Sequence, residues 1–559
     1  MSSTRHSRKT VSKDFVAGIT GAVVGIPQAM GFALIAGVSP IYGLYTAIIS
    51  TLIGGVFSSS SLMTIAPTNA LVLVVFSTLH TDNQPFVIEK LFILTLLVGI
   101  FQLLLGLLHL GDLTRFVSNA VMTGFIAGAG LLIILGQLPN LTGYVRNTNV
   151  NGIIPRFLDL LAHPNQWQLS TLVVGLSALI IIVSLRQLPR YKIFSALVAI
   201  TFASVISIIL GLGDVEIVGD VATITRGLPY PTNIIPSLGH VTELLPAALS
   251  MAILALVQGA GIANSVSNGD DQEESDINRD FMAQGLANIV GSVFQNIPSG
   301  GSLSRTAVNV DAGAKTRLSN IFAASFIAIA LLTLGQYMEY IVLAALAAQL
   351  IVAAYGLIDM KRIQMVWKVS QPGRITMIMT FLATLIMPLE YSIYVGVALS
   401  LISYVYTSSQ NLEVVMLEST PGDHFRETAL PQTLPDDRAV IFSIHGHLYF
   451  AAVQRLQNML PDAEKGEHHV VILRLRHNQY MGSTGIRFVC QYAQNLEKHG
   501  GRLILAGIGT EIQHQLERTG TLQQLGEENV YYANGTILSA TTKALAEANR
   551  WLGVTSSRN

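Results

Sequence analysis

Residues 297–308 read IPSGGSLSRTAV, and this stretch decides how the surrounding chain folds. Arg305 is the only charged residue between Asp280 and Asp311, although the flanking segments are apolar enough to be membrane spans. A charge at membrane depth is costly, so an arginine there is a functional residue by default. Pro298 favours extended backbone before it, and the two glycines that follow permit a tight break in a helix. The stretch therefore predicts a short, interrupted span with a charge near its start.

A second interrupted segment lies in the first half of the chain, at LMTIAPTNALVLVV (62–75). It has the same order of features: an apolar stub, a proline (Pro67), small polar residues and a helix-forming run. Irregular backbone at membrane depth is tolerated only where it lines a cavity of the protein. Matched interruptions in two halves indicate a transporter site at the midplane, and the free N–H groups of half-helices favour an anion. A kink buried by helix packing is the alternative for either segment alone.

The whole chain has the composition of a polytopic membrane protein. Of its 559 residues, 51% are hydrophobic and 12% are charged, against roughly 25% charged in soluble domains. The net charge of −1 excludes a broad basic surface for nucleic acid. The apolar runs predict two sets of seven spans, most of them near the length that crosses about 30 Å of hydrocarbon. They are 14–37, 41–58, 64–79, 87–109, 116–136, 168–185 and 193–212, then 243–265, 280–295, 303–314, 318–334, 337–357, 374–388 and 391–407.

Lysine and arginine set the predicted orientation. With the basic N-terminal tail (1–13) in the cytoplasm, alternate loops near 186–192, 315–317 and 361–374 carry clustered basic residues, and the opposite loops carry fewer. This asymmetry follows the positive-inside rule. An even number of spans then returns the C-terminus to the cytoplasm, and we expect no cleavable signal peptide.

After the transmembrane region (14–410), the density of charged residues rises and a different fold is predicted. Residues 411–437 read as a polar linker, and 438–559 as a separate domain with its C-terminal tail. Strand-like runs at 439–444, 469–475 and 502–507 alternate with helical patterns at 451–460, 484–499, 511–519 and 536–549. This alternation predicts a small α/β domain.

Four parts of the chain resemble the SulP anion permeases, the family of sulfate permeases, cyanobacterial bicarbonate transporters and animal anion exchangers. They are AGITGAVVGIPQAMGFALIAGVSPIYGLY (17–45), IAPTNA (65–70), QGLANIVGSVFQNIPSGGSLSRTAVNVDAGAKT (284–316) and the C-terminal domain. The resemblance implies a polytopic α-helical membrane protein with a seven-plus-seven inverted repeat, half-helices in spans 3 and 10, and a core domain that moves against a gate domain. Uracil and xanthine permeases share this membrane fold but lack the C-terminal domain. We also expect a homodimer in a bacterial inner membrane.

The resemblance places the substrate anion between the starts of spans 3 and 10. N–H groups and hydroxyls there would replace water around an oxyanion, and the residues are Thr68, Asn69, Ala70, Ser302, Leu303 and Ser304. Gln28 matches a polar position of the family that faces this pocket, although a glutamine can also bridge two membrane helices. Arg305 adds positive potential beside the half-helix ends; its alternative role is structural, in bonding loose carbonyls of the broken segments.

Gln258 departs from the family pattern, which often has an acidic residue at this position. Glutamine cannot titrate and offers one carbonyl oxygen, so simple proton symport through this position is disfavoured. Na⁺ near Gln258, Ser302 and Ser304 stays open, since hard cations accept neutral oxygen ligands, and so does exchange without a coupled cation. We expect no cofactor and no resident metal ion.

GHLYFAAV (446–453) and NQYMGSTGIRFV (478–489) resemble the STAS domain that closes SulP transporters. In bacterial anti-sigma antagonists the matching loop is phosphorylated on a hydroxyl before a glycine, which is Thr484 here. Gly482 replaces the usual aspartate and weakens this role, and a hydroxyl at a helix start is more often an N-cap. The domain is also the expected contact for regulatory proteins.

The sequence contains no catalytic constellation, so we expect a transporter and not an enzyme. The leading prediction is secondary active transport of a small inorganic anion by alternating access, with sulfate first because of the breadth of the family. A sodium-dependent bicarbonate transporter and a chloride or anion exchanger are the alternatives within this class. An anion channel, or a membrane sensor that signals through the STAS domain, is the alternative from another class.

Overall fold

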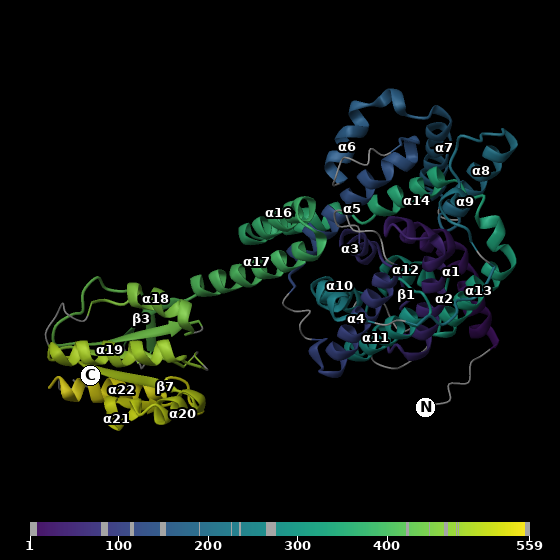
Figure 1. Ribbon diagram of the computed structural model, residues 1–559. Helices are drawn as coiled ribbons and strands as arrows, with labels where there is room; N and C mark the ends of the chain where they lie inside the picture. The colour runs from purple at the N-terminus through teal and green to yellow at the C-terminus, as the bar shows by residue number, and fades with distance from the viewer. Residues whose placement is uncertain are drawn as a thin grey trace. The chain divides into compact units, whose positions relative to one another are not determined.

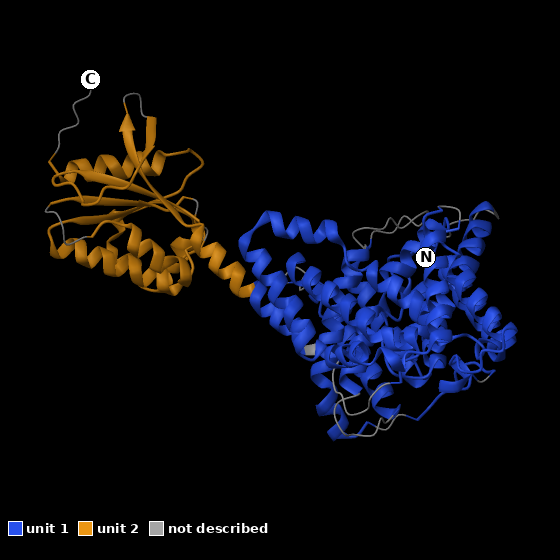
Figure 2. Cartoon of the chain, turned by 90° about the horizontal axis from the view of Figure 1, so that it is seen from above, with its two compact units in different colours: residues 1–400 blue, residues 401–559 orange. Residues whose placement is uncertain are grey.

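The protein is described by a computed structural model that forms two compact units, residues 1–400 and 401–559 (Figure 2). The structure describes residues 8–79, 88–111, 117–145, 153–188, 191–224, 226–233, 236–263, 275–420, 424–446, 448–462, 468–476, 478 and 480–553. Each unit is treated separately below.

The first unit is helical, and each of the fourteen predicted spans corresponds to one helix (Figure 1). The first set is α1 (Arg8–Ile35), α2 (Pro40–Phe57), α3 (Asn69–Leu79), α4 (Ile88–Leu107), α5 (Asn119–Thr142), α7 (Leu169–Arg186) and α8 (Ser195–Ile209). The second set is α10 (Leu238–Ala263), α11 (Ile277–Val293), α12 (Leu303–Asp311), α13 (Leu318–Met338), α14 (Leu343–Tyr355), α16 (Gln371–Ile386) and α17 (Leu389–Gln410). Within the described residues, nine helical segments are long and apolar enough to cross a membrane.

Three further helices in this unit were not predicted: α6 (Ile153–Ala162), α9 (Val218–Val221) and α15 (Met360–Val369). At ten residues or fewer they are too short to span the hydrocarbon core, which takes about 20 residues of helix. Helices α6 and α15 are also amphipathic, with charged residues among the apolar ones. They therefore connect spans without adding to their number.

The two interrupted segments pair with each other through their extended stubs. Strand β1 (Ile65–Ala66) runs antiparallel to β2 (Gly300–Gly301), with Ile65 opposite Gly301 and Ala66 opposite Gly300. The amide of Ser302 also donates to the carbonyl of Thr64 (2.9 Å). Backbone groups that no helix satisfies at membrane depth need such partners. The pairing therefore brings the starts of α3 and α12 to one place, as the half-helix prediction requires.

Close helix crossings hold α11, and with it β2, in position. A Cβ built on Gly285 of α11 would lie 2.5 Å from the backbone nitrogen of Leu103 in α4. A Cβ on Gly99 of α4 would lie 2.7 Å from the backbone nitrogen of Ile289. Only glycine permits this approach at both positions, so α4 and α11 pack backbone to backbone.

A buried carboxylate fixes the loop between α2 and β1. Asp280 is 2% exposed, and its Oδ1 accepts hydrogen bonds from the amides of Ser59 (2.7 Å) and Ser60 (2.9 Å). The hydroxyls of Ser58, Ser59 and Ser60 also donate to this carboxylate. Asp14, which is fully buried, similarly accepts from the amides of residues 315 and 316, in the loop that follows α12.

We expect Asp280→Ala to destabilise the protein by roughly 2–4 kcal/mol, because buried donors that lose a charged acceptor keep their desolvation cost. The measurement is the apparent melting temperature of detergent-purified protein, determined from the fraction that stays monodisperse after heating. Asp280→Asn keeps the shape and one acceptor oxygen, so its melting temperature should fall between those of the wild type and the alanine variant. An unchanged melting temperature in Asp280→Ala would show that the loop is held by other contacts.

The second unit is a six-stranded sheet with helices (Figure 2). The strand order is β4-β3-β5-β6-β7-β8. The strands are β3 (Glu413–Thr420), β4 (His424–Thr428), β5 (Ala439–His445), β6 (Val470–Arg474), β7 (Arg502–Ile508) and β8 (Val530–Tyr532), and β5 to β8 are parallel. The helices are α18 (Phe450–Met459), α19 (Ser483–Lys498), α20 (Thr510–Arg518), α21 (Thr521–Leu525) and α22 (Ser539–Trp551). The predicted α/β alternation is therefore present.

The prediction of a linker over 411–437 is wrong for much of that range. Strands β3 and β4 lie inside it and are hydrogen-bonded antiparallel to each other, and β3 also pairs with β5. The reason is burial, because Val414 and Leu417 of β3 are 5% and 9% exposed and belong to the apolar core of the sheet. The sheet thus begins about 25 residues before the predicted domain boundary at 438.

Candidate functional site

The starts of α3 and α12 are capped in the same way. The hydroxyl of Thr68 accepts from the amide of Leu71 (3.4 Å), and the hydroxyl of Ser302 accepts from the amide of Arg305 (3.4 Å). Each hydroxyl thus satisfies the third amide of its own helix, as an N-cap residue does. Thr68 and Ser302 are 7% and 2% exposed.

Two amides at the start of each half-helix stay free within the described residues. They belong to Asn69 and Ala70 in α3 and to Leu303 and Ser304 in α12, and no described group accepts a hydrogen bond from them. Leu303 is 62% exposed and Ser304 is also exposed, so this end of α12 is open to solvent. The arrangement offers anion-binding N–H groups on two facing elements.

Two glutamines connect the half-helices to longer spans in a reciprocal pattern. Gln28 of α1 donates through Nε2 to the hydroxyl of Ser304 in α12 (3.0 Å). Gln258 of α10 accepts through Oε1 from the hydroxyl of Thr68 at the start of α3 (3.3 Å). The first span of each half therefore contacts the half-helix of the other half: α1 contacts α12, and α10 contacts the start of α3. Gln28 Oε1 is buried and has no partner among the described atoms.

Arg305 lies one turn into α12 and is 4% exposed. Its guanidinium packs against α1, because a Cβ built on Gly25 would lie 2.5 Å from Arg305 Cζ. Gly25 precedes Gln28 by three residues, so Arg305 and the Gln28–Ser304 contact share one face of α1. No described carboxylate pairs with Arg305, and its Nη2 has no described hydrogen-bond partner.

The site is consequently positive and lacks a counter-charge among the described residues. Each helix N-terminus is equivalent to about +0.5 elementary charge, and Arg305 adds a full charge, so the local total is near +2. A charge buried at membrane depth without a partner is strongly unfavourable. An anion at the two N-termini would supply the missing partner.

Two family models match the chain: the sulfate permease family over residues 11–380 and the STAS domain over residues 431–536. The chain belongs to the sulfate permease family. This is a family of transporters, not of enzymes, and the chain is a multi-pass integral membrane protein. The predicted resemblance to the SulP permeases and to the STAS domain is thereby confirmed.

Relatives of this sulfate permease family member extend along nearly the whole chain. Sulfate transporter 4.1, chloroplastic, of Arabidopsis thaliana is 29% identical over 542 residues, which cover 92% of this chain and 78% of that protein. The YvdB protein of Bacillus subtilis is 26% identical over 531 residues, 94% of this chain and 97% of its own. The solved structure of SLC26A9 aligns with a TM-score of 0.84 at 20% identity and covers 97% of this chain and 91% of its own. The predicted fold, with its inverted repeat and STAS domain, is confirmed by this likeness.

The predicted Na⁺ ligands of this permease family member lie at two ends of the site. Gln258 contacts Thr68 at the start of α3, whereas Ser302 and Ser304 lie 3.4 Å apart, hydroxyl to hydroxyl, at the start of α12. No described hydrogen bond joins Gln258 to either serine. A sodium site that uses all three side chains stays a prediction.

Thr484 does not have the capping role predicted for it. The N-cap of α19 is Gly482, and Thr484 is the second helical residue, exposed to solvent. Its hydroxyl lies inside the first turn, where it cannot accept from the helix amides as an N-cap does. A regulatory role for Thr484 stays a prediction.

Gly25 is a site residue that the sequence did not single out. Because Gly25 has no side chain, the guanidinium of Arg305 can pack directly against the backbone of α1. The signal was present in GAVVGIPQAM (21–30), where Gly25 precedes Gln28 by one turn, but its meaning depends on a partner 280 residues away.

We expect Gly25→Ala to weaken anion binding about threefold to tenfold, which corresponds to about 0.7–1.4 kcal/mol, because the new methyl displaces the guanidinium. The control is Gly21→Ala, one turn earlier on α1, whose Cβ would lie at an ordinary 3.5 Å from Ala323 Cβ. The measurement is the dissociation constant of sulfate for purified protein. Equal affinities in both variants would mean that the position of the Arg305 guanidinium on α1 does not affect sulfate affinity.

Proposed function

We propose that the protein is a secondary active transporter of sulfate, with the anion bound between the starts of α3 and α12. The observation that carries this proposal is the buried Arg305 beside two half-helix N-termini with free amides and no described counter-charge. A local charge near +2 suits a dianion better than a monoanion. Relatives that are themselves named sulfate transporters support the same substrate.

In the proposed complex the anion exchanges its water shell for protein groups. The amides of Asn69, Ala70, Leu303 and Ser304 donate to its oxygens. Gln28 orients the hydroxyl of Ser304 and Gln258 orients the hydroxyl of Thr68. Arg305 supplies long-range attraction. Binding is reversible, because each of these groups is neutral or keeps its charge when the anion leaves.

Transport is proposed to occur by alternating access, with the helices that bear the site moving against the others. Gln258 cannot carry a coupling proton, so we propose coupling to Na⁺ or to a counter-anion. We also propose that the protein is a homodimer in a bacterial inner membrane, that both termini are cytoplasmic, and that the STAS domain contacts regulatory proteins. The clustered lysines and arginines of alternate loops support this orientation.

The test is counterflow of labelled sulfate in proteoliposomes. Internal unlabelled sulfate should stimulate uptake of the label, and external sulfate should compete better than equal concentrations of bicarbonate or chloride. Parallel assays with and without Na⁺ report the coupling ion. Stronger competition by bicarbonate or chloride than by sulfate would show that the competing anion, not sulfate, is the substrate. Large unitary currents without counterflow would indicate a channel.

A further inference from the structure

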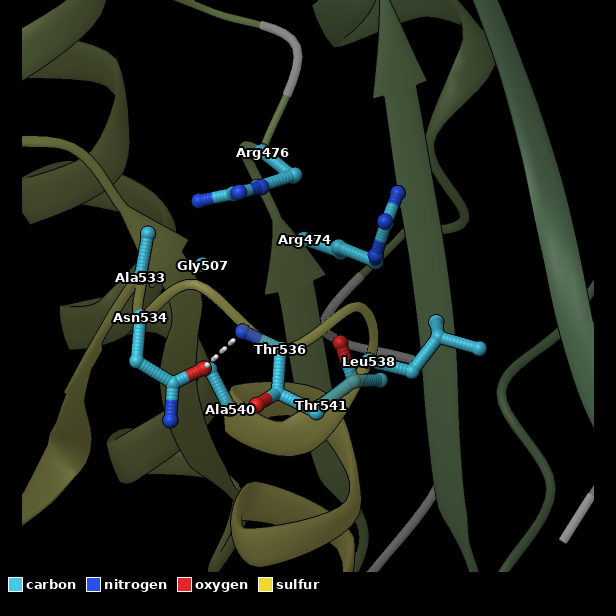
Figure 3. A pocket seen from close by; sticks show the side chains of 9 residues that line it. All are labelled: Arg474, Arg476, Gly507, Ala533, Asn534, Thr536, Leu538, Ala540 and Thr541. Atoms are coloured by element: carbon cyan, nitrogen blue, oxygen red, sulfur yellow. Dashed lines mark hydrogen bonds between the residues drawn. The ribbon is translucent and has the colours of Figure 1, made fainter.

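A second positively charged site lies in the second unit, at the carboxyl ends of three parallel strands. A pocket there, open to solvent, spans about 210 Å³ that no atom fills. It is lined by Arg474, Arg476, Gly507, Ala533, Asn534, Thr536, Leu538, Ala540 and Thr541 (Figure 3). In open α/β sheets, ligands bind outside the carboxyl ends of the strands.

The arginines come from the end of β6 and the residues that follow it. Arg474 is the last residue of β6 and 7% exposed, and its Nη1 donates to the neutral hydroxyl of Ser443 (3.0 Å). Arg476 is exposed at the rim, and Gly507 makes room for it, since a Cβ there would lie 3.2 Å from Arg476 Cβ. Figure 3 shows both arginines on the side of the pocket opposite Thr536, Ala540 and Thr541.

Neither arginine forms an ion pair with a described carboxylate. Burial and the charge of Arg476 lower the pKa of Arg474 below its usual value, while the charge of Glu427 acts in the opposite direction. Two cations thus face one pocket, one of them more than nine-tenths buried, with no carboxylate among the described lining residues.

The opposite wall is the start of α22, a helix of 13 residues without a side-chain cap. Its N-cap residue is Leu538, whose apolar side chain cannot accept from the first-turn amides. No described group accepts a hydrogen bond from the backbone amides of Ser539, Ala540 and Thr541. Free amides at a helix start and guanidinium groups are the two donor types that bind oxyanions in proteins.

We propose that this pocket binds a tetrahedral oxyanion, sulfate or phosphate, between Arg474, Arg476 and the N-terminus of α22. Two guanidinium groups and the free amides of one helix start can surround the oxygens of a compact anion, so the ligand is the small anion. This site is separate from the half-helix site, and it does not depend on which anion the protein transports.

The test is hydrogen exchange of the full-length protein in detergent, read by mass spectrometry in peptides that cover residues 533–541. Sulfate or phosphate, added at constant ionic strength with chloride as the reference, should slow exchange there at least threefold. Arg476→Gln should abolish this slowing, and because Arg476 is exposed the variant keeps the fold. The matched control Arg487→Gln, an exposed arginine of α19 outside the pocket, should keep it.

Arg305→Gln separates this site from the one in the membrane. It should leave the slowing at 533–541 intact, so that failure of the transport proposal does not affect this result. A response to only one of the two oxyanions identifies the ligand. The proposal is overturned if neither oxyanion slows exchange beyond chloride, or if the slowing survives in Arg476→Gln.

Discussion

Ala70→Asp is expected to lower sulfate affinity at least a hundredfold and to abolish uptake. Ala70 is the second residue of α3 and is 5% exposed, so the new carboxylate lies beside the free amides. At an effective dielectric near 20, two unit charges about 5 Å apart interact with about 3 kcal/mol, and a dianion doubles the repulsion. Even after water screens part of this term, a loss of about 2.7 kcal/mol, a factor of a hundred, remains. The fold should persist, because a carboxylate in the first turn stabilises a helix.

The matched control is Ala70→Asn, which has nearly the same shape and no charge. It should retain most of the affinity, so that a loss in both variants would report crowding and not charge. Ser302→Asp repeats the experiment at α12 with a residue that still caps the helix. Labelled-sulfate uptake and binding by purified, monodisperse protein are the measurements. Wild-type uptake by a folded Ala70→Asp protein would show that the anion does not bind at this end of α3.

Arg305→Gln should weaken anion binding about tenfold, equivalent to about 1.4 kcal/mol. Glutamine keeps hydrogen-bond donors but loses the charge. Arg305→Lys keeps the charge and loses the planar fork, so it should retain much of the affinity. The distinction matters because the guanidinium has no described ion-pair partner, so its full charge is available to attract the anion.

Binding and thermal stability must be measured on the same preparations of both Arg305 variants. Unchanged sulfate affinity in Arg305→Gln would contradict a role of the charge in binding. An equal loss of melting temperature in Arg305→Gln and Arg305→Lys would show instead that the arginine acts by packing on Gly25. Affinity and stability thus report the two roles separately.

The half-helices were predictable because local chemistry specifies them. Pro67 and Pro298 each precede a run of small polar residues and a helix-forming segment, and the structure has a two-residue strand and then a capped helix at each place. Membrane depth allows few ways to satisfy broken backbone. The matched pattern in two halves was therefore enough to predict the two half-helices. That an anion binds between their starts stays a prediction.

Contacts between distant parts of the chain were not predictable from one sequence. Gln28 and Ser304 are separated by 276 positions, and Thr68 and Gln258 by 190. No local pattern specifies which glutamine meets which hydroxyl. Asp280 was also missed as a structural residue, because a carboxylate at the start of a helix usually reads as solvated, whereas here three consecutive serines bind it.

The hairpin of β3 and β4 was missed for a different reason. Residues 413–420 follow the end of α17 without a turn signal such as glycine or proline, so their apolar positions were absorbed into a polar linker. Their strand conformation is specified by pairing with β5. Strand preference depends on such cross-strand neighbours more than on the residues themselves.

The β1–β2 pairing and the two glutamine contacts tie α1, α3, α10 and α12 together around Arg305. If these helices move as one body, Arg305 travels with the bound anion, and membrane voltage acts on their combined charge. With sulfate bound the moving body carries about −1 from anion and arginine, and without it about +1. A full transit of one charge corresponds to about 2.3 kcal/mol per 100 mV. The loaded body moves inward with −1 and the empty body returns outward with +1, so one polarity of voltage favours both steps. Turnover should therefore depend on voltage even without a coupled cation.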